Sequence, residues 1–517
     1  MVVDEKIRAK IKSVPQLCAA IGARPRQHKV IMCHGTFDVV HPGHIRHLMY
    51  AKSKADVLVV SLTADEHITK ANFRPFVPEQ LRAMNLAALE MVDHVIIDAE
   101  AKPLKNLGLI QPDYFAKGYD YVKDGLDPRT REELNVLEGF GGEFLYTPGD
   151  IVYSSSAIIE SAPPDIAVEK LMTLLEAEGM AFADLGAALT QLKGKHVHVV
   201  GDTIVDSYTY TTLIGGNTKT PTFSVRWEKQ QDYVGGAGIV AKHLRAAGAD
   251  VTFTTVLGED RLKDFVLKDL GEAGIKVHPI VDRTRPTTNK NAFIAGGYRL
   301  LKVDTLDNRS ISERILGEIK ATLAATPADA VVFSDFRHGM FNRRTIGELI
   351  EAIPAGVYRV ADSQVASRWG NILEFKGFDL ITPNEREARF ALGDQDSVVR
   401  PLGLELYKQA ECRTLMLKLG ERGMITYRAV PKQTEDVRAF FVVDSFAQSI
   451  VDAVGSGDAL LAYATLAMLA TQNEVTAAVL GSLAAAVECA HDGNVPVSPA
   501  DVERLLERIE KHATFRP

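Results

Sequence analysis

The sequence predicts a two-domain α/β protein, with a Rossmann-like domain followed by a larger α/β domain. Three observations predict it. Apolar strand-like runs alternate with helical patterns along the chain, a proline-containing breaker cluster interrupts them at 161–165, and a fresh apolar run begins at 196–200. Strands that alternate with helices form βαβ units around parallel sheets. A chain of 517 residues is long enough for two or three domains.

The first domain is predicted over 1–160. A short amphipathic helical segment over 1–28 precedes its first strand, and a helical pattern over 79–92 precedes its third. The predicted strands are 29–32, 56–61, 93–97 and 113–116. Each is a short apolar run of the kind that is buried in a parallel sheet.

The second domain is predicted over 191–517, after a helical linker at 161–190 that begins with the breaker cluster. After the strand at 196–200, further strand-like runs occupy 251–258, 328–336, 357–363, 378–384 and 414–420. Three Gly-Gly pairs stand among short β-like stretches, at 215–216, 235–236 and 296–297. These stretches predict a small lid sheet beside the main one.

The composition of the chain argues against some classes of function. The 59 basic and 67 acidic side chains give a net charge of −8, which argues against nucleic acid as a partner but not against small phosphorylated ligands. The most apolar stretch, 459–470, is far shorter than the roughly 20 residues that span a membrane, so we expect a buried helix there and no membrane partner.

The N-terminus and the cysteines indicate a compartment. Charges occupy the N-terminus where a signal peptide needs an apolar run. The four cysteines, Cys18, Cys33, Cys412 and Cys489, stand far apart and form no metal-binding pair. Sparse, unpaired cysteine is typical of a reducing environment, and we expect a cytoplasmic protein.

A first candidate site lies at 34–48, where a strand leads into a helix through a His- and Gly-rich turn. Free amides and the helix dipole at such a helix start attract anions. His41 and His44 are three residues apart and therefore share one helix face, while Gly35 lets the backbone approach a ligand. Alternatively, the two histidines are ordinary surface or core residues, or zinc ligands that lack an evident third partner.

A second candidate site is the string DAVGSGD at 452–458, just before the apolar stretch. Gly455, Ser456 and Gly457 can point backbone amides at one spot and form an anion hole. Asp458 at its mouth suits a general base that takes a hydroxyl proton during phosphoryl transfer. The alternative is a small-residue turn that only caps a helix.

The pattern G-T-F-D-x-x-H-x-G-H at 35–44 resembles the signature of the cytidylyltransferase-like nucleotidyltransferases. The resemblance implies that His41 and His44 stabilise charge on a nucleoside triphosphate attacked at its α-phosphate, without a covalent intermediate. Asp38 would support the substrate. The remaining nucleotide contacts implied are Gly35, Thr36, Phe37, Lys117, Ser154, Ser155 and Ser156.

Two features of this domain leave alternatives open. The serines at 154–156 are also typical of a helix N-cap, since an apolar helical run follows them. The family's arginine upstream of that segment has no counterpart at 149–153. Lys70, Arg74 and Arg82 are candidate substitutes, or solvated charges.

The string at 452–458 resembles the D-x-x-G-A-G-D signature of the ribokinase-like (PfkB) carbohydrate kinases, with Ser456 in place of alanine. Over about 195–510 the resemblance implies a ribokinase-like fold with a small β lid, in which Asp458 is the base. It implies sugar contacts from Asp202, Asp206, Gly235 and Gly236, although Ile239 replaces a family asparagine. It implies nucleotide contacts from Lys418, Gly420, Gly423, Gly455, Ser456, Gly457 and Asn494, and Mg²⁺ placed through water by Asn384 and Glu387.

Together the two sites resemble the bifunctional heptose-7-phosphate kinase/heptose-1-phosphate adenylyltransferase family, with the domains in reversed order. The resemblance implies anomeric phosphorylation of a sugar phosphate by ATP and Mg²⁺, then transfer of a nucleotide from a second triphosphate, ATP or alternatively CTP. Another sugar or polyol phosphate is a second alternative, and a non-catalytic regulator that binds nucleotide and sugar phosphate is a third. Resemblance to the kinases also implies a homodimer formed through the lid sheet.

Overall fold

A computed structural model of the chain describes residues 5–68, 75–118, 128–147, 167–216, 223–364, 371–429, 440–447, 450–491 and 493–514. The chain divides into two compact units, Met1–Thr173 and Leu174–Pro517, with the division inside helix α8 (Ala167–Ala177). Each unit is described by itself.

In the described part of the first unit, a five-stranded parallel sheet has the order β3-β2-β1-β4-β5. Its strands are β1 (Val30–Gly35), β2 (Val57–Thr63), β3 (His94–Asp98), β4 (Tyr114–Gly118) and β5 (Glu143–Thr147). The first four confirm the predicted strands, whose starts lie within one residue of those observed. The strand order reverses between β1 and β4, which is where open α/β sheets bind ligands.

Helices cover both faces of this sheet. They are α1 (Glu5–Arg8), α2 (Val14–Ile21), α3 (Pro42–Lys52), the 3-10 turn η1 (Asp65–His67), α4 (Glu79–Ala87), α5 (Leu104–Ile110) and α6 (Pro128–Glu138). Alternate residues of β1 face opposite ways. Ile31 packs with Leu48 of α3 and Leu86 of α4, whereas Met32 packs with Leu17 of α2 and Leu107 of α5. Each face thus has its own apolar core.

The second unit contains a nine-stranded sheet in its described residues, with the order β10-β9-β6-β13-β14-β15-β16-β17-β18. It is parallel from β10 to β16 and antiparallel in its last two pairings. The strands are β6 (His196–Gly201), β9 (Asp250–Leu257), β10 (Lys276–Val281), β13 (Ala330–Asp335), β14 (Tyr358–Ser363), β15 (Leu380–Ile381), β16 (Thr414–Lys418), β17 (Met424–Arg428) and β18 (Phe440–Val443).

Helices flank this sheet, and α16 and α17 are almost wholly apolar. The helices are α9 (Phe182–Thr190), α10 (Ala237–Ala246), α11 (Arg261–Glu272), α12 (Glu313–Ala325), α13 (Arg343–Glu351), η3 (Ile372–Glu374), α14 (Glu385–Leu392), α15 (Val399–Ala410), η4 (Gly420–Arg422), α16 (Ser456–Thr471), α17 (Glu474–Cys489) and α18 (Pro499–Thr514). The apolar stretch predicted as a buried helix is the inner part of α16. No helix among the described residues has the length and apolar character needed to cross a membrane.

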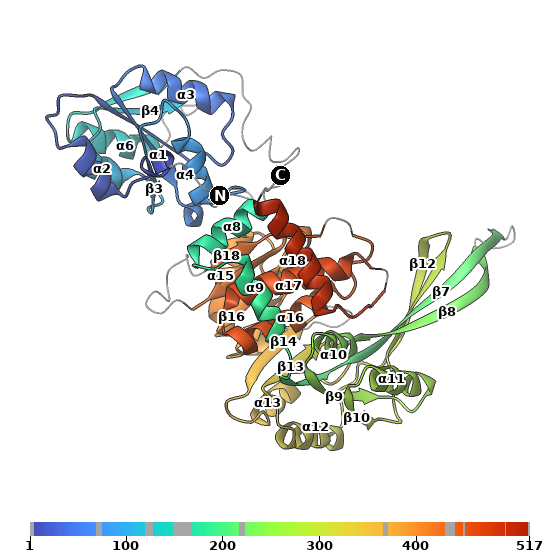
Figure 1. Ribbon diagram of the computed structural model, residues 1–517. Coiled ribbons are helices and arrows are strands. Elements are labelled where there is room, and N and C mark those ends of the chain that lie inside the picture. Colours follow the sequence, from blue (N-terminus) through green and yellow to red (C-terminus); the bar gives the residue numbers. More distant parts are fainter. Residues whose placement is uncertain are drawn as a thin grey trace. The chain divides into compact units, whose positions relative to one another are not determined.

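A separate four-stranded sheet projects from the second unit as a twisted arm (Figure 1). Its order is β12-β11-β7-β8, with strands β7 (Thr203–Gly216), β8 (Phe223–Gly236), β11 (Asn289–Ala295) and β12 (Tyr298–Thr305). Two of the three Gly-Gly pairs end β7 and β8, and the third forms the β11–β12 turn. The predicted lid sheet is therefore confirmed, and we call this four-stranded sheet the lid sheet.

Candidate active sites

The first candidate site is built around the start of α3, directly after β1. His41 is the N-cap of α3, and its Nδ1 accepts a hydrogen bond of 3.1 Å from the backbone N–H of Gly43. Because Nδ1 accepts, the ring hydrogen sits on Nε2 and can be donated to an anion. The rings of His41 and His44 are stacked with centroids 3.9 Å apart, and Phe37 contacts His44. The structure thus brings the two predicted histidines together.

These imidazoles are neutral at neutral pH. Burial lowers the pKa of His44 to about 4, with further lowering from His41 and His47. Burial, followed by the charge of Arg46, also lowers the pKa of His41. A neutral imidazole keeps one N–H, and His41 can donate it to a phosphate at this helix start.

The turn between β1 and α3 is fixed by a buried carboxylate and a buried guanidinium. Both oxygens of Asp38 accept backbone hydrogen bonds, 3.0 Å from Phe76 and 2.8 Å from Val77. Arg82 of α4 is fully buried and donates to the carbonyls of Thr36, Thr63 and Val77 and to the carboxylate of Asp65. Arg82 is therefore not a solvated charge, and its donors go to protein acceptors.

Of the remaining predicted residues of this unit, some lie within the described ranges and others do not. Gly35 ends β1, and Lys117 on β4 is buried in an ion pair with Glu133 of α6. Lys70, Arg74 and the serines Ser154, Ser155 and Ser156 lie outside the described residues. Sequence reasoning missed His34, whose Nδ1 lies 3.0 Å from the Ser61 hydroxyl, and burial lowers its pKa to about 3.

The second candidate site lies at the start of α16, where Asp458 stands in the first helical turn. Asp458 is buried, and burial, then the neighbouring charge of Asp362, raises its pKa well above the usual range. Gly455 is the N-cap with φ +93°, a conformation that favours glycine. A Cβ on Gly455 would lie 2.7 Å from a carboxylate oxygen of Glu488, so the loop also needs glycine for close approach.

Two predicted sugar contacts, Asp206 and Gly235, reach the same place from the lid sheet. Asn494 Nδ2 donates 3.2 Å to Asp206 on β7, and a Cβ on Gly235 of β8 would lie 2.1 Å from that carboxylate. The charge of Asp206 contributes to the raised pKa of Asp458. A predicted sugar contact and the predicted base therefore lie close together, and Asn494, predicted as a nucleotide contact, donates a hydrogen bond to that sugar contact.

A third group lies at the carboxyl ends of β14 and β16. Lys418 Nζ donates 2.8 Å to Asp362, and a Cβ on Gly457 would lie 3.3 Å from that ammonium. Both carboxylate oxygens of Glu387 accept hydrogen bonds from Asn384, at 2.7 Å each, and the pair caps α14. Burial, then Asp362, raises the pKa of Glu387 to about 7. Gly420 and Gly423 flank η4, just beyond β16.

Asp202 anchors the segment 336–342 that follows β13. Its Oδ2 accepts from the backbone N–H of Phe336 at 3.0 Å and of His338 at 3.2 Å. Gly236 begins α10 against the Asp202 carbonyl, and Ile239 is buried in that helix. Asp202 therefore holds a loop beside the predicted sugar pocket.

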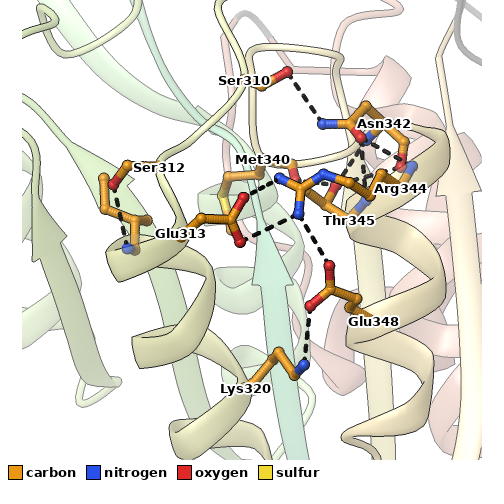
Figure 2. Close-up of polar contacts among 10 residues, drawn as sticks. Ser310, Ser312, Glu313, Lys320, Met340, Asn342, Arg344, Thr345 and Glu348 are labelled. Carbon is orange, nitrogen blue, oxygen red and sulfur yellow. Dashed lines mark hydrogen bonds and ion pairs between the residues drawn. The ribbon is translucent and has the colours of Figure 1, made fainter.

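Figure 2 shows how the far end of this segment is held. The Asn342 amide donates 3.3 Å to the Ser310 hydroxyl, and the Thr345 hydroxyl donates 2.8 Å to the Met340 carbonyl. Arg344 of α13 pairs with Glu313 of α12 at 2.8 Å and with Glu348 at 3.0 Å. Asn342 thus ties the end of the segment to the residues before α12, and the Arg344–Glu313 pair joins α12 to α13.

Two carboxylates of this site were missed by sequence reasoning. Asp362 lies near the end of β14, and its place at the carboxyl end of a predicted strand was the available signal. Glu488 lies in α17, where nothing in the local sequence distinguishes it from an ordinary helical glutamate. Burial raises the pKa of Glu488 to about 8.

Comparisons with known proteins match both units. The model of the pfkB family carbohydrate kinases matches residues 195–500, and the cytidylyltransferase-like model matches residues 32–161. Among curated proteins, the chain is 28% identical over 339 residues to "Bifunctional protein HldE" of Rhodopseudomonas palustris (strain ATCC BAA-98 / CGA009), covering 64% of this chain and 66% of that protein. It is also 28% identical over 319 residues to the protein of the same name from Desulfatibacillum aliphaticivorans, covering 60% of this chain and 63% of that protein.

The chain thus spans a little under two thirds of the length of the curated relatives it matches. Among solved structures, Escherichia coli phosphofructokinase-2 in complex with substrates and products gives a TM-score of 0.51 at 16% identity, covering 61% of this chain and 99% of that chain. This likeness confirms the ribokinase-like fold of the second unit.

The cytidylyltransferase-like match precedes the kinase match, so the transferase-first order is confirmed. The kinase model alone covers more than half of the chain, on the unit that holds Asp458 and the glycine turn before it. The chain belongs to the pfkB family of carbohydrate kinases and carries a cytidylyltransferase-like domain ahead of the kinase domain.

Proposed function

We propose that the chain makes a nucleotide sugar in two consecutive steps. The kinase domain phosphorylates heptose 7-phosphate at its anomeric hydroxyl with ATP, and the transferase domain then joins the resulting 1-phosphate to an adenylyl group, giving ADP-heptose and pyrophosphate. The observation that carries the proposal is the convergence of the Gly455–Gly457 turn, Asp206 and Lys418 around the buried Asp458.

In the kinase step, Asp458 takes the proton of the anomeric hydroxyl. Burial and the neighbouring charge of Asp362 raise its pKa, and a carboxylate with a raised pKa is a stronger base. The amides at the start of α16 and the ammonium of Lys418 hold the transferring phosphoryl group. Asp206 orients the sugar by accepting hydrogen bonds from its hydroxyls.

Mg²⁺ fits beside Glu387 and Asn384. Buried Glu387 and Asp362 are close enough to raise the pKa of Glu387, an excess of negative charge that a divalent cation offsets. Both Glu387 oxygens already accept from Asn384, so their remaining lone pairs can hold the ion through water. Mg²⁺ bound there would neutralise charge on the triphosphate, and Glu387 and Asp362 are the carboxylates that would hold it through water.

In the transferase step, His41 and His44 act on the triphosphate of the second nucleotide. His41 Nε2 carries a hydrogen for a phosphate oxygen, and the start of α3 adds backbone N–H groups. Alignment of the sugar 1-phosphate for in-line attack and stabilisation of the charged transition state supply the catalysis, with no covalent intermediate.

A homodimer through the lid sheet is part of the proposal. The strand register places several exposed apolar side chains on the face opposite Asp206: Leu213, Trp227, Leu301 and Val303. An exposed apolar face of this kind is typical of a protein–protein contact, and a second copy offers a matching one.

A coupled assay tests the proposed function. The full chain, Mg²⁺ and each of ATP, CTP and GTP are incubated with heptose 7-phosphate and with other sugar and polyol phosphates, and nucleotide sugars are detected by mass. We expect ADP-heptose from heptose 7-phosphate and ATP alone. A different sugar or base in the product would replace the assigned substrate, and no nucleotide sugar from any pair would contradict the two-step function.

A further inference from the structure

Two lysines of the lid sheet lie on the same face as Asp206. Lys290 of β11 stands directly opposite Asp206 of β7 in the parallel register, and Ala292, two residues further along β11, stands opposite Lys302 of β12. Opposed residues project from the same face of a sheet, as do residues two apart on one strand. Lys290, Lys302 and Asp206 therefore face the sugar side together.

These two lysines form no hydrogen bond and no ion pair with any residue in the described ranges. Burial, then the like charge of Lys302, lowers the pKa of Lys290. Asp304 stands opposite Lys290 in the register but forms no ion pair with it. Neither ammonium group forms an ion pair with the neighbouring carboxylates of Asp206 and Asp304, so both can gain a charge-assisted contact from an anionic ligand.

A buried histidine with one ring nitrogen that lacks a hydrogen-bond partner in the described part of the chain, His338, lies near Lys290. His338 is only 5% exposed, and its Nδ1 lies 2.8 Å from the Asn308 side-chain oxygen. Because that oxygen can only accept, Nδ1 carries the hydrogen and Nε2 is left as an acceptor. Nε2 is buried and has no hydrogen-bond partner among the described residues. Burial, then the charge of Lys290, lowers the pKa of His338 to about 4, so the ring is neutral.

The position of His338 is fixed before any ligand arrives. Its backbone N–H donates to Asp202, and the following residues are held by the Thr345–Met340 and Asn342–Ser310 hydrogen bonds (Figure 2). A buried acceptor on a fixed loop suits recognition of one hydroxyl, because a ligand without it leaves the acceptor unpaired.

We propose that Lys290 and Lys302 bind the phosphate that the sugar substrate already carries, and that His338 Nε2 accepts a hydrogen bond from one of its hydroxyls. The proposal rests on the proposed kinase function. The substrate then lies along Asp206, with its anomeric hydroxyl at Asp458 and its phosphate at the lid sheet. Charge-assisted bonds to phosphate select a sugar phosphate over the free sugar.

The phosphate contact is tested by comparing full-length variants with wild type on two substrates, heptose 7-phosphate and the same heptose without phosphate. Lys290→Met should lower kcat/KM for heptose 7-phosphate by about 10- to 100-fold, the usual worth of a charge-assisted hydrogen bond, and leave the KM for ATP unchanged. The free heptose should lose almost nothing. Lys276→Met, at an exposed lysine of β10, is the matched control. Equal losses with both sugars would overturn the phosphate contact.

The histidine contact has a different signature, because the hydroxyl is common to both sugars. His338→Ala should raise the KM of both by a similar factor, and His338→Gln, which restores an acceptor, should recover part of the loss. A KM unchanged by His338→Ala would overturn this contact.

A second measurement does not depend on turnover. Lysine acetylation of the full chain by acetic anhydride is followed by peptide mass spectrometry, with inorganic phosphate as the probe against sodium chloride of equal ionic strength. Phosphate should slow labelling of Lys290 and Lys302 but not of Lys276. If wild type phosphorylates neither sugar, the proposed substrate fails while this labelling still decides the phosphate site, and equal labelling with and without phosphate would overturn it.

Discussion

Close approach of backbone and side chains defines the kinase site at the level of single residues. Gly455 must adopt a positive φ and leave room for Glu488, and Gly235 must leave room for Asp206. Both positions surround Asp458, for which we propose backbone amides on one side and the sugar on the other. The glycines of this site are thus set by what lies against them.

Substitution of Gly455 tests this interpretation. Gly455→Ala places a Cβ 2.7 Å from Glu488 at φ +93°, so the anion-hole turn must shift. We expect kcat of the kinase to fall by about 100-fold, the usual cost of one misplaced transition-state donor, with nucleotidyl transfer from supplied sugar 1-phosphate unchanged. Gly271→Ala on α11, where nothing lies within 4 Å, is the control and should leave kcat unaltered. A Gly455→Ala variant with normal kcat would refute an anion hole at this turn.

At the scale of elements, α4 fixes the turn between β1 and α3 through Arg82. This guanidinium joins the ends of β1 and β2 to the segment before α4, because its acceptors are Thr36, Thr63 and Val77. Loss of one partner from a buried charged network leaves the other groups unpaired.

Arg82→Met should therefore destabilise the first unit. We expect a cost of about 3 kcal/mol, which lowers the melting temperature of that unit by roughly 10 °C in calorimetry of the full chain. Kinase turnover should persist, since Arg82 lies in the other unit. Arg46→Met, at an exposed residue of α3, should change neither quantity noticeably. An unshifted melting profile for Arg82→Met would show that the network is dispensable.

Elements were predictable where their signals are local. Apolar runs predicted β1 to β4, and small-residue strings predicted the starts of α3 and α16 and the Gly-Gly pairs of the lid sheet. The partners of Arg82 were not predictable, because they come from three segments that meet only in the fold. Strand β5 was missed for a different reason, since its short run Glu143–Thr147 has no strong apolar pattern.

The candidate site residues, like the elements, were predictable only where the local sequence marks them. His41, His44, Asp458 and Gly455 sit in motifs, whereas Glu488 and Asp362 acquire their importance from residues far away in sequence. The Lys290–Asp206 neighbourhood depends on strand register, which alternation of side chains alone does not determine.

At the scale of the whole molecule, each unit holds its own candidate site. Among the described residues, the two apolar cores around the sheet of the first unit draw their residues from that unit alone, and a large apolar core of the second unit likewise stays within its own unit. The net charge of −8 is consistent with the proposed function, in which backbone amides, neutral histidines and a few lysines would hold the phosphates. If the two sites are independent, mutation should abolish one activity without the other. A mixture of two such variants should then regain the complete two-step reaction.

Complementation between two full-length variants tests this central claim most directly. With heptose 7-phosphate, ATP and Mg²⁺, Asp458→Asn should form neither sugar 1-phosphate nor nucleotide sugar, and His44→Ala should accumulate sugar 1-phosphate. An equal mixture of the two should release ADP-heptose and pyrophosphate. The account would be contradicted if the mixture stayed inactive with both variants folded, or if either variant alone produced ADP-heptose at the wild-type rate.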